Sequence, residues 1–310
     1  MTLFALRGLA VSLSMFVLAY AALRLAVACG WTLTRHRFPW LSPNALYALQ
    51  VGPFVVAAVV VGAFTIPSFL RFEPRIVQEP FGPPVLALGA ACVALLGIGA
   101  YRARKAYSRT ARIVSEWRAN AAPINDPQGL PIYKTGPDAP PFVVAGFWRP
   151  KLLVSSSTSG VLSEQELARA ISHESAHIKR HDNLKKLMLK MCSFPLTAEI
   201  ERRWLAAVEI DADRHAVRSQ REALDLASAL VKASRMSTPT AELTTNFTGE
   251  PGTLLQVRVQ RLLEWDADQR SSNLLRYGST VFAALMTLAI LASYSSILVY
   301  MHRLAEVLMD

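Results

Sequence analysis

Cysteine is scarce in this chain: Cys29, Cys92 and Cys192 stand far apart in 310 residues. None belongs to a Cys-x-x-Cys pair, so the sequence excludes a disulfide framework and a thiolate zinc site. We expect the three side chains to be buried as small hydrophobic groups. Histidine is nearly as rare, with six residues, and a close pair of histidines is therefore informative.

Acidic residues are also few, 23 against 33 lysines and arginines, which gives a formal charge of +10. No pattern of arginine and aromatic residues typical of nucleic-acid recognition accompanies this charge. The basic residues lie largely beside long apolar runs, where they would face lipid headgroups. The expected partner is a lipid bilayer, and no nucleic-acid partner is expected.

Four apolar runs account for much of the 52% hydrophobic content. They cover Leu3–Trp31, Ala45–Leu70, Pro84–Tyr101 and Tyr277–Met301. A helix of about 20 residues crosses the roughly 30 Å hydrocarbon core of a membrane. The sequence therefore predicts an α-helical membrane anchor of four transmembrane helices.

The first two of these runs contain residues that are unusual in a membrane span. The first run has an alternative interpretation as a cleaved signal peptide, because Ala26–Cys29 resembles a cleavage site. Arg24 argues against it, since a charge inside the apolar core of a signal peptide is unusual, whereas near the end of a true span the side chain can extend to the headgroups. In the second run, Pro53 and Pro67 are expected to kink the helix.

The distribution of basic residues predicts the orientation of the anchor. Six of them follow the third run with a single acid, Glu116: Arg102, Arg104, Lys105, Arg109, Arg112 and Arg118. Because cytoplasmic loops carry an excess of lysine and arginine, residues 102–275 are predicted to be cytoplasmic. The N-terminus and the tail His302–Asp310 are then outside. The expected location is a bacterial inner membrane, crossed several times.

Residues 102–275 have the composition of an α+β domain. Short strands are predicted around Ile132–Lys134 and over Phe142–Ala145 and Lys151–Ser155. Pro150, between the last two, favours an edge position over a central one. Ser163 and Glu166 form a capping box, which predicts a helix from there to Arg180. Further helices are predicted over Leu184–Cys192, which Pro195 follows, and over Ala198–Met236.

The first of these helices carries His173-Glu174-Ser175-Ala176-His177. Residues four apart lie on one face of a helix, so His173 and His177 can present two imidazoles to one metal ion. Glu174 follows His173 directly, so its side chain is expected to point beside the metal and not at it. That is the position that a general base for a metal-activated water requires. The motif predicts a zinc hydrolase, with Zn²⁺ as the cofactor.

Catalytic zinc usually takes three protein ligands, so a third must be found. We favour Glu209, with Asp213 one helical turn later orienting a histidine ligand. His181 and His215 are the alternatives. His181 would have to come from the same helix as the histidine pair, which cannot wrap three ligands around one ion without a break. The interpretation of His181 as a polar contact at the helix end is therefore preferred. Glu209 and Asp213, taken without the histidine helix, would be interpreted as solvated carboxylates paired with arginines.

Together these motifs resemble the membrane metallopeptidases of the BlaR/MecR type, the beta-lactam sensor-transducers and their sensorless relatives. The resemblance covers three spans, the Gly-Phe-Trp-Arg-Pro turn within 142–155, the block Leu162–Asn183, the segment Glu209–Asp213 and a fourth span. It implies a gluzincin-like fold with zinc held by His173, His177 and Glu209. It also implies that Glu174 is the catalytic base and that Asp213 lies behind the ligands. We expect His181, as the polar contact at the helix end, to lie behind them as well. A strand near Phe142, Val143, Val144 and Ala145 or over Lys151–Ser155 is expected to pair with the substrate peptide.

The chain departs from the resembled family at two places. Only His302–Asp310 follow the fourth span, so no sensor domain is expected there, and a separate sensor protein or a homo-oligomer is the expected partner. Phe194-Pro195 stands where the family usually has Asn-Pro.

The function predicted from these features is a regulatory zinc endopeptidase that cleaves a protein or peptide substrate, such as a transcriptional repressor, or itself. An HtpX-type quality-control protease or a CAAX-protease relative is the alternative of the same class. HtpX-type proteins have further spans soon after the zinc helix, whereas Leu184–Ser193 is short and contains three lysines. A catalytically inactive membrane scaffold or receptor is the alternative from another class.

Overall fold

The computed structural model describes residues 2–37, 41–75, 82–119, 121–124, 131–192, 198–236, 245–246, 252–265 and 275–309. Contacts divide the chain into two compact units, and each is described by itself. The first comprises Met1–Pro39, Val51–Ile98 and Arg270–Asp310, and the second Trp40–Gln50 and Gly99–Gln269. The domain borders near residues 101 and 275 stay a prediction.

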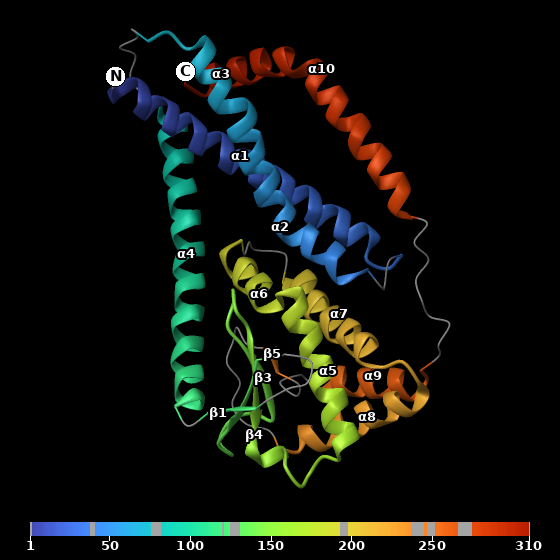
Figure 1. The fold of residues 1–310 in the computed structure, drawn as a ribbon. Helices are drawn as coiled ribbons and strands as arrows, with labels where there is room; N and C mark the ends of the chain where they lie inside the picture. The colour runs from blue at the N-terminus through green and yellow to red at the C-terminus, as the bar shows by residue number, and fades with distance from the viewer. Residues whose placement is uncertain are drawn as a thin grey trace. The chain divides into compact units, whose positions relative to one another are not determined.

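Long helices make up the first part of the chain (Figure 1). They are α1 (Thr2–Thr34), α2 (Pro43–Val60), the π-helix η1 (Val61–Thr65), α3 (Ile66–Phe72) and α4 (Pro83–Arg118). Within the described residues, three stretches are long and apolar enough to cross a membrane: Leu3–Thr34, Pro43–Phe72 and Pro83–Arg118. They match the first three predicted spans.

Pro67 lies at the start of α3, directly after η1. Because proline has no N–H, the carbonyl of Ala63, four residues earlier, cannot receive the usual helical hydrogen bond. The hydroxyl of Tyr294 on α10 (Leu275–Met309) donates to that carbonyl oxygen at 3.0 Å. The disturbance predicted at Pro67 therefore takes the form of a π-helical turn, and a neighbouring helix satisfies the freed carbonyl.

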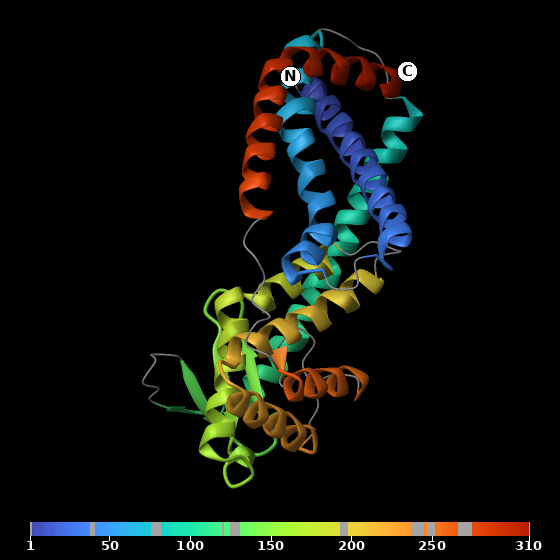
Figure 2. The same ribbon diagram turned by 90° about the vertical axis from the view of Figure 1, so that its right-hand side faces the viewer.

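Helix α10 contains the fourth predicted span, Tyr277–Met301, and packs against α3 and η1. The side chains of its first half lie outside the described set, and a fourth membrane crossing stays a prediction. The helix is bent and runs on to Met309 (Figures 1 and 2). The tail predicted after Met301 is thus helical, and an ion pair of His302 with Glu306 at 3.3 Å spans one of its turns.

The sequence led us to expect that the Arg24 side chain extends to the lipid headgroups. In the structure the side chain is buried. Only 1% of the residue is exposed. Its Nε donates to the hydroxyl of Tyr20 at 3.1 Å, and the guanidinium lies 5.2 Å from the centre of the Tyr20 ring. An aromatic partner one turn earlier therefore contributes to stabilising the buried cation.

The basic segment after the third span is helical, not a loop, because α4 continues through it to Arg118. Val114 and Trp117 pack against Val143, Ala145 and Leu153 of the sheet in the second unit. This apolar stripe explains why the segment continues as a helix, with its basic side chains on the remaining faces.

A five-stranded mixed sheet forms part of the second unit. Its strands are β1 (Ala122–Ile124), β2 (Ile132–Thr135), β3 (Phe142–Ala145), β4 (Lys151–Ser155) and β5 (Thr245–Asn246). The order is β1-β2-β4-β3-β5, with β2 and β4 parallel and the other pairs antiparallel. The bounds predicted for β3 and β4 are confirmed, and the expected hairpin joins them.

The edge position expected from Pro150 is wrong. Strand β4 lies between β2 and β3, and the other side of β3 pairs with β5 at Val143 and Val144. Both faces of β3 and β4 are buried: alternate residues such as Phe142 and Val144 join the main core, and their neighbours face α4. The proline is accommodated because it stands in the turn, one residue before β4.

Five further helices of the second unit lie within the described residues. They are α5 (Glu164–Arg180), α6 (Asp182–Met191), α7 (Ala198–Ala216), α8 (Gln220–Ser234) and α9 (Gly252–Leu263). The capping box of Ser163 and Glu166 is confirmed at the start of α5. The long helical segment predicted over Ala198–Met236 forms two helices. The hydroxyl of Ser219 accepts a hydrogen bond from the backbone of Glu222 and caps the second of them, α8. Pro195 lies outside the described residues.

Candidate metal centre

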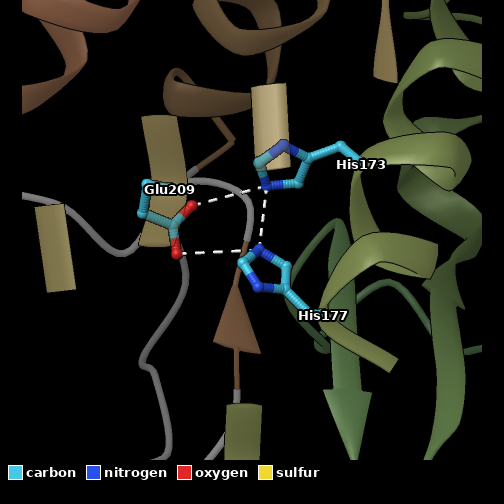
Figure 3. Close-up of side chains that lie close together, drawn as sticks. All are labelled: His173, His177 and Glu209. Carbon is cyan, nitrogen blue, oxygen red and sulfur yellow. Dashed lines mark hydrogen bonds and ion pairs between the residues drawn. The ribbon is translucent and has the colours of Figure 1, made fainter. Parts of the chain in front are cut away.

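Three buried side chains from α5 and α7 converge on one point (Figure 3). The Nε2 atoms of His173 and His177 lie 3.1 Å apart. The carboxylate of Glu209 is 3.4 Å from the first and 3.7 Å from the second. The structure thus brings together the three residues that the sequence analysis selected as metal ligands.

The spacing of these atoms fits a tetrahedral ion. Ligand bonds of about 2.1 Å to zinc place two ligand atoms about 3.4 Å apart, and the observed separations of 3.1, 3.4 and 3.7 Å are centred on that value. Two imidazoles and a carboxylate form the donor set of many catalytic zinc sites. The three residues therefore fit zinc, and the set leaves a fourth position for water or substrate.

Asp213 supports His173 from behind. Its Oδ1 lies 2.9 Å from Nδ1 of His173, on the side of the ring away from Glu209. Burial lowers the pKa of His173, but hydrogen bonds to Asp213 and Glu209 outweigh burial and raise this pKa to about 9. The contact directs Nε2 toward the ligand cluster, which is the role expected of Asp213.

His177 is held in the same way, but by Asp182 and not by His181. Oδ2 of Asp182 lies 2.8 Å from Nδ1 of His177. His181, by contrast, is exposed and adopts a left-handed conformation with φ of 53° between α5 and α6. The prediction that His181 lies behind the ligands is wrong. The turn at His181 ends α5, and the residue that contacts the ring of His177 is Asp182.

The helix break that the sequence did not reveal lies at His181 itself. Among the described residues it is the only one other than glycine with a positive φ, a conformation in which histidine is more common than most residues. Directly after it, the amide of Asn183 donates to the carbonyls of Val144 at 2.7 Å and Gly146 at 3.2 Å. The turn therefore also ties the end of the histidine helix to β3.

Glu174 is fully buried beside the cluster. Neither of its carboxylate oxygens has a hydrogen-bond partner within the described part of the chain. Burial raises the pKa of Glu174, and the nearby histidines only partly offset this effect. A buried carboxylate with no partner is costly to the fold and is poised to accept a proton from a group that enters the site.

His215, the remaining candidate for third ligand, does not take part. Its side chain is 63% exposed, and its Nδ1 lies 2.7 Å from the carbonyl oxygen of Asp211 on its own helix.

Sequence reasoning missed Arg258, on α9. This fully buried arginine donates from Nε and one terminal nitrogen to both oxygens of Asp213, at 2.7 and 2.6 Å. Its other terminal nitrogen donates to Glu209 at 3.2 Å. A signal was present, because Leu255, Val259 and Leu262 mark the apolar face of α9 and Arg258 lies on that face.

These features define the class of a metallopeptidase: an α+β domain in which a helix bearing two histidines and a glutamate meets a carboxylate from a second helix. Residues 137–307 match the model of peptidase family M48. The chain belongs to this family of zinc metallopeptidases. No curated protein matches the chain.

The chemistry of the site follows from the positions of its residues. Bound zinc would supply a Lewis acid that acidifies water and polarises a peptide carbonyl. The chain's own contribution is to hold His173 and His177 in one orientation and to exclude bulk water. It also places the Glu174 carboxylate beside the ligands, where it can take a proton from the attacking water and return it to the leaving amine.

The Asp182→Asn substitution should weaken zinc binding by about 10- to 100-fold. The asparagine has the shape of the aspartate but lacks the charge that holds the proton on Nδ1 of His177, so Nε2 is no longer fixed as the metal-facing atom. Zinc affinity is measured by competition with a chromogenic chelator. Asp138→Asn, at an exposed position of the same unit, is the control, and equal affinities for both variants would contradict the assignment.

Zinc binding should release protons at neutral pH. The pKa of His173 is raised from 6.5 to about 9, so in the metal-free protein this charged imidazole stabilises the fold fully below 6.5, and the stabilisation is lost as pH rises through about 9. Zinc requires the neutral ring, so the affinity should instead increase as pH rises toward 9.

The release is measured by calorimetry in buffers of different ionisation enthalpy at about pH 7.5, where roughly one proton per zinc is expected from His173. Asp213→Asn removes the contact that contributes most to raising the pKa of His173 and should reduce the number released. A wild-type value near zero would contradict the prediction.

Proposed function

We propose that this protein is a membrane-anchored zinc endopeptidase with a regulatory role, which cleaves a cytoplasmic or membrane-associated protein. The observation that carries the proposal is the buried cluster of His173, His177 and Glu209 with the Glu174 carboxylate beside it, which has no hydrogen-bond partner among the described residues. A scaffold has no use for such a carboxylate, because an unpartnered buried acid destabilises the fold.

The arrangement of helices favours the BlaR/MecR type over the HtpX type. Helix α6, which follows the histidine helix, has ten residues, about half the length needed to cross a membrane. Its lysines form part of the second unit, where Lys185 lies 3.4 Å from Asp182. No membrane span therefore follows the histidine helix directly, in contrast to the arrangement of HtpX-type proteins.

The proposed substrate segment is an extended peptide that pairs with β3, over Phe142–Ala145. Support comes from Asn183, which fixes the carbonyls of Val144 and Gly146 relative to the end of the histidine helix. A peptide hydrogen-bonded along this strand would be held in a defined register beside the cluster. The orientation of the domain toward the cytoplasm, in a bacterial inner membrane, is part of the same proposal and rests on the charges of the basic residues that follow the third span.

The test uses the full chain in detergent and in lipid vesicles. Wild-type protein should cleave unfolded casein or itself, lose this activity with a zinc chelator and regain it when zinc is restored. The Glu174→Gln variant is then used to trap uncleaved substrate in cells that express the tagged full chain.

Each outcome of the trap is informative. A single regulator or repressor recovered with the variant supports the regulatory role. A heterogeneous set of unfolded membrane proteins favours the quality-control alternative. Wild-type protein that contains zinc yet cleaves neither casein, itself nor any trapped protein favours the scaffold.

A further inference from the structure

Arg258 is a buried cation placed against two acids of the metal centre. None of its surface is exposed, and the guanidinium bonds both oxygens of Asp213 and one oxygen of Glu209. A charged group removed from water is stable only when it is paired and hydrogen-bonded. The two carboxylates, which come from one face of α7, supply this pairing.

We infer that Arg258 is a positioning residue of the metal centre: its guanidinium fixes the rotamers of Glu209 and Asp213 and so sets the geometry in which zinc is held. The inference rests on the proposed function only in taking the cluster of His173, His177 and Glu209 as the metal site.

The geometry explains how one side chain acts on both sides of the site. The planar guanidinium offers a rigid fork, and both arms of its contact with Asp213 are short, at 2.6 and 2.7 Å. Asp213 in turn contacts Nδ1 of His173 at 2.9 Å. Arg258 therefore orients one ligand directly, through Glu209, and a second indirectly, through Asp213.

Charge leads to the same conclusion. Glu174, Glu209 and Asp213 are all buried and would repel one another if ionised without compensation. Arg258 supplies a fixed positive charge on the side of Glu209 and Asp213. A lysine could supply the charge, but it could not bond both carboxylates in one plane. The Arg258→Lys substitution therefore separates positioning from charge.

The experiment compares the full-length wild type with Arg258→Lys. Zinc affinity should fall by about 10- to 100-fold in the variant. With cobalt in place of zinc, the visible absorption bands report the coordination geometry, and they should change in position and intensity. Arg261→Lys is the matched control on the same helix and should leave both readouts unchanged. Wild-type affinity together with an unchanged cobalt spectrum in Arg258→Lys would overturn the inference.

A second variant decides the matter if Arg258→Lys does not fold. Arg258→Gln combined with Asp213→Asn removes both members of the main ion pair, and Asp213→Asn alone is its reference. If the double variant binds zinc at least about 10-fold more weakly than the reference, Arg258 also acts through Glu209, as inferred. Equal affinities would mean that it only balances the charge of Asp213, and the inference would fail.

These readouts need no substrate. Failure of the proposed peptidase activity would leave the zinc and cobalt results interpretable, and failure of the inference about Arg258 would leave wild-type peptidase activity intact.

Discussion

Replacing Glu174 by glutamine is expected to abolish peptide hydrolysis, with a loss of about 100- to 10,000-fold or more, while zinc remains bound. Glutamine has the size of glutamate but cannot accept the proton. The three residues that converge as metal ligands are unchanged in this variant. Activity is measured on a fluorogenic peptide or casein, with zinc content determined for the same sample.

The same substitution should make the metal-free protein more stable. The pKa of Glu174 is raised by burial, so the ionised carboxylate destabilises the fold as pH rises above the pKa that it has in the unfolded chain. Glutamine removes this cost at neutral pH, and the midpoint of thermal unfolding should increase. Loss of activity combined with a gain of stability distinguishes a catalytic group from a structural one.

Glu164→Gln, at an exposed position of the same helix, is the matched control and should change neither quantity. An active Glu174→Gln enzyme would place the general base elsewhere.

Replacing Glu209 by alanine should reduce zinc affinity by more than about 100-fold. This loss exceeds the roughly 10- to 100-fold expected when a residue that only orients a metal ligand is removed. The substitution removes one of the three converging side chains and leaves Arg258 without one of its partners. Zinc content after dialysis against a weak chelator is the measurement, with peptide hydrolysis as a second readout.

Glu201→Ala is the control for Glu209→Ala. Glu201 lies on the same helix, α7, and pairs with Lys190 at 3.7 Å, away from the metal ligands. Full zinc occupancy in Glu209→Ala would show that another group is the third ligand.

Local signals in the sequence were enough to predict the histidine helix of the site and the strands beside it. The capping box of Ser163 and Glu166 fixed the start of α5, and the β-branched residues flanking the Gly146–Pro150 turn fixed β3 and β4. The spacing of His173 and His177 is a property of one helix, so no knowledge of distant contacts was needed to place them together.

The features that the sequence did not predict depend mainly on contacts between distant parts of the chain. The continuation of α4 past the membrane span becomes clear only when Val114 and Trp117 are seen against the sheet. Arg258 is separated from Glu209 by 49 positions, and periodicity alone marks it only as a charge on an apolar face. The prediction for His181 failed for a different reason. Its left-handed conformation ends α5, and its neighbour Asp182 lies behind the ligand His177 in its place.

The short strand β5 has an energetic consequence for any peptide that pairs with β3. Its two residues already occupy Val143 and Val144, so a substrate on that edge must first displace them. If roughly two hydrogen bonds of about 0.5–1.5 kcal/mol each are broken, the open form amounts to about one molecule in six to about one in 160. The apparent affinity for a peptide falls by the same fraction. Only segments that form more than two residue pairs with β3 gain more than they displace, which selects for long, extended stretches of chain.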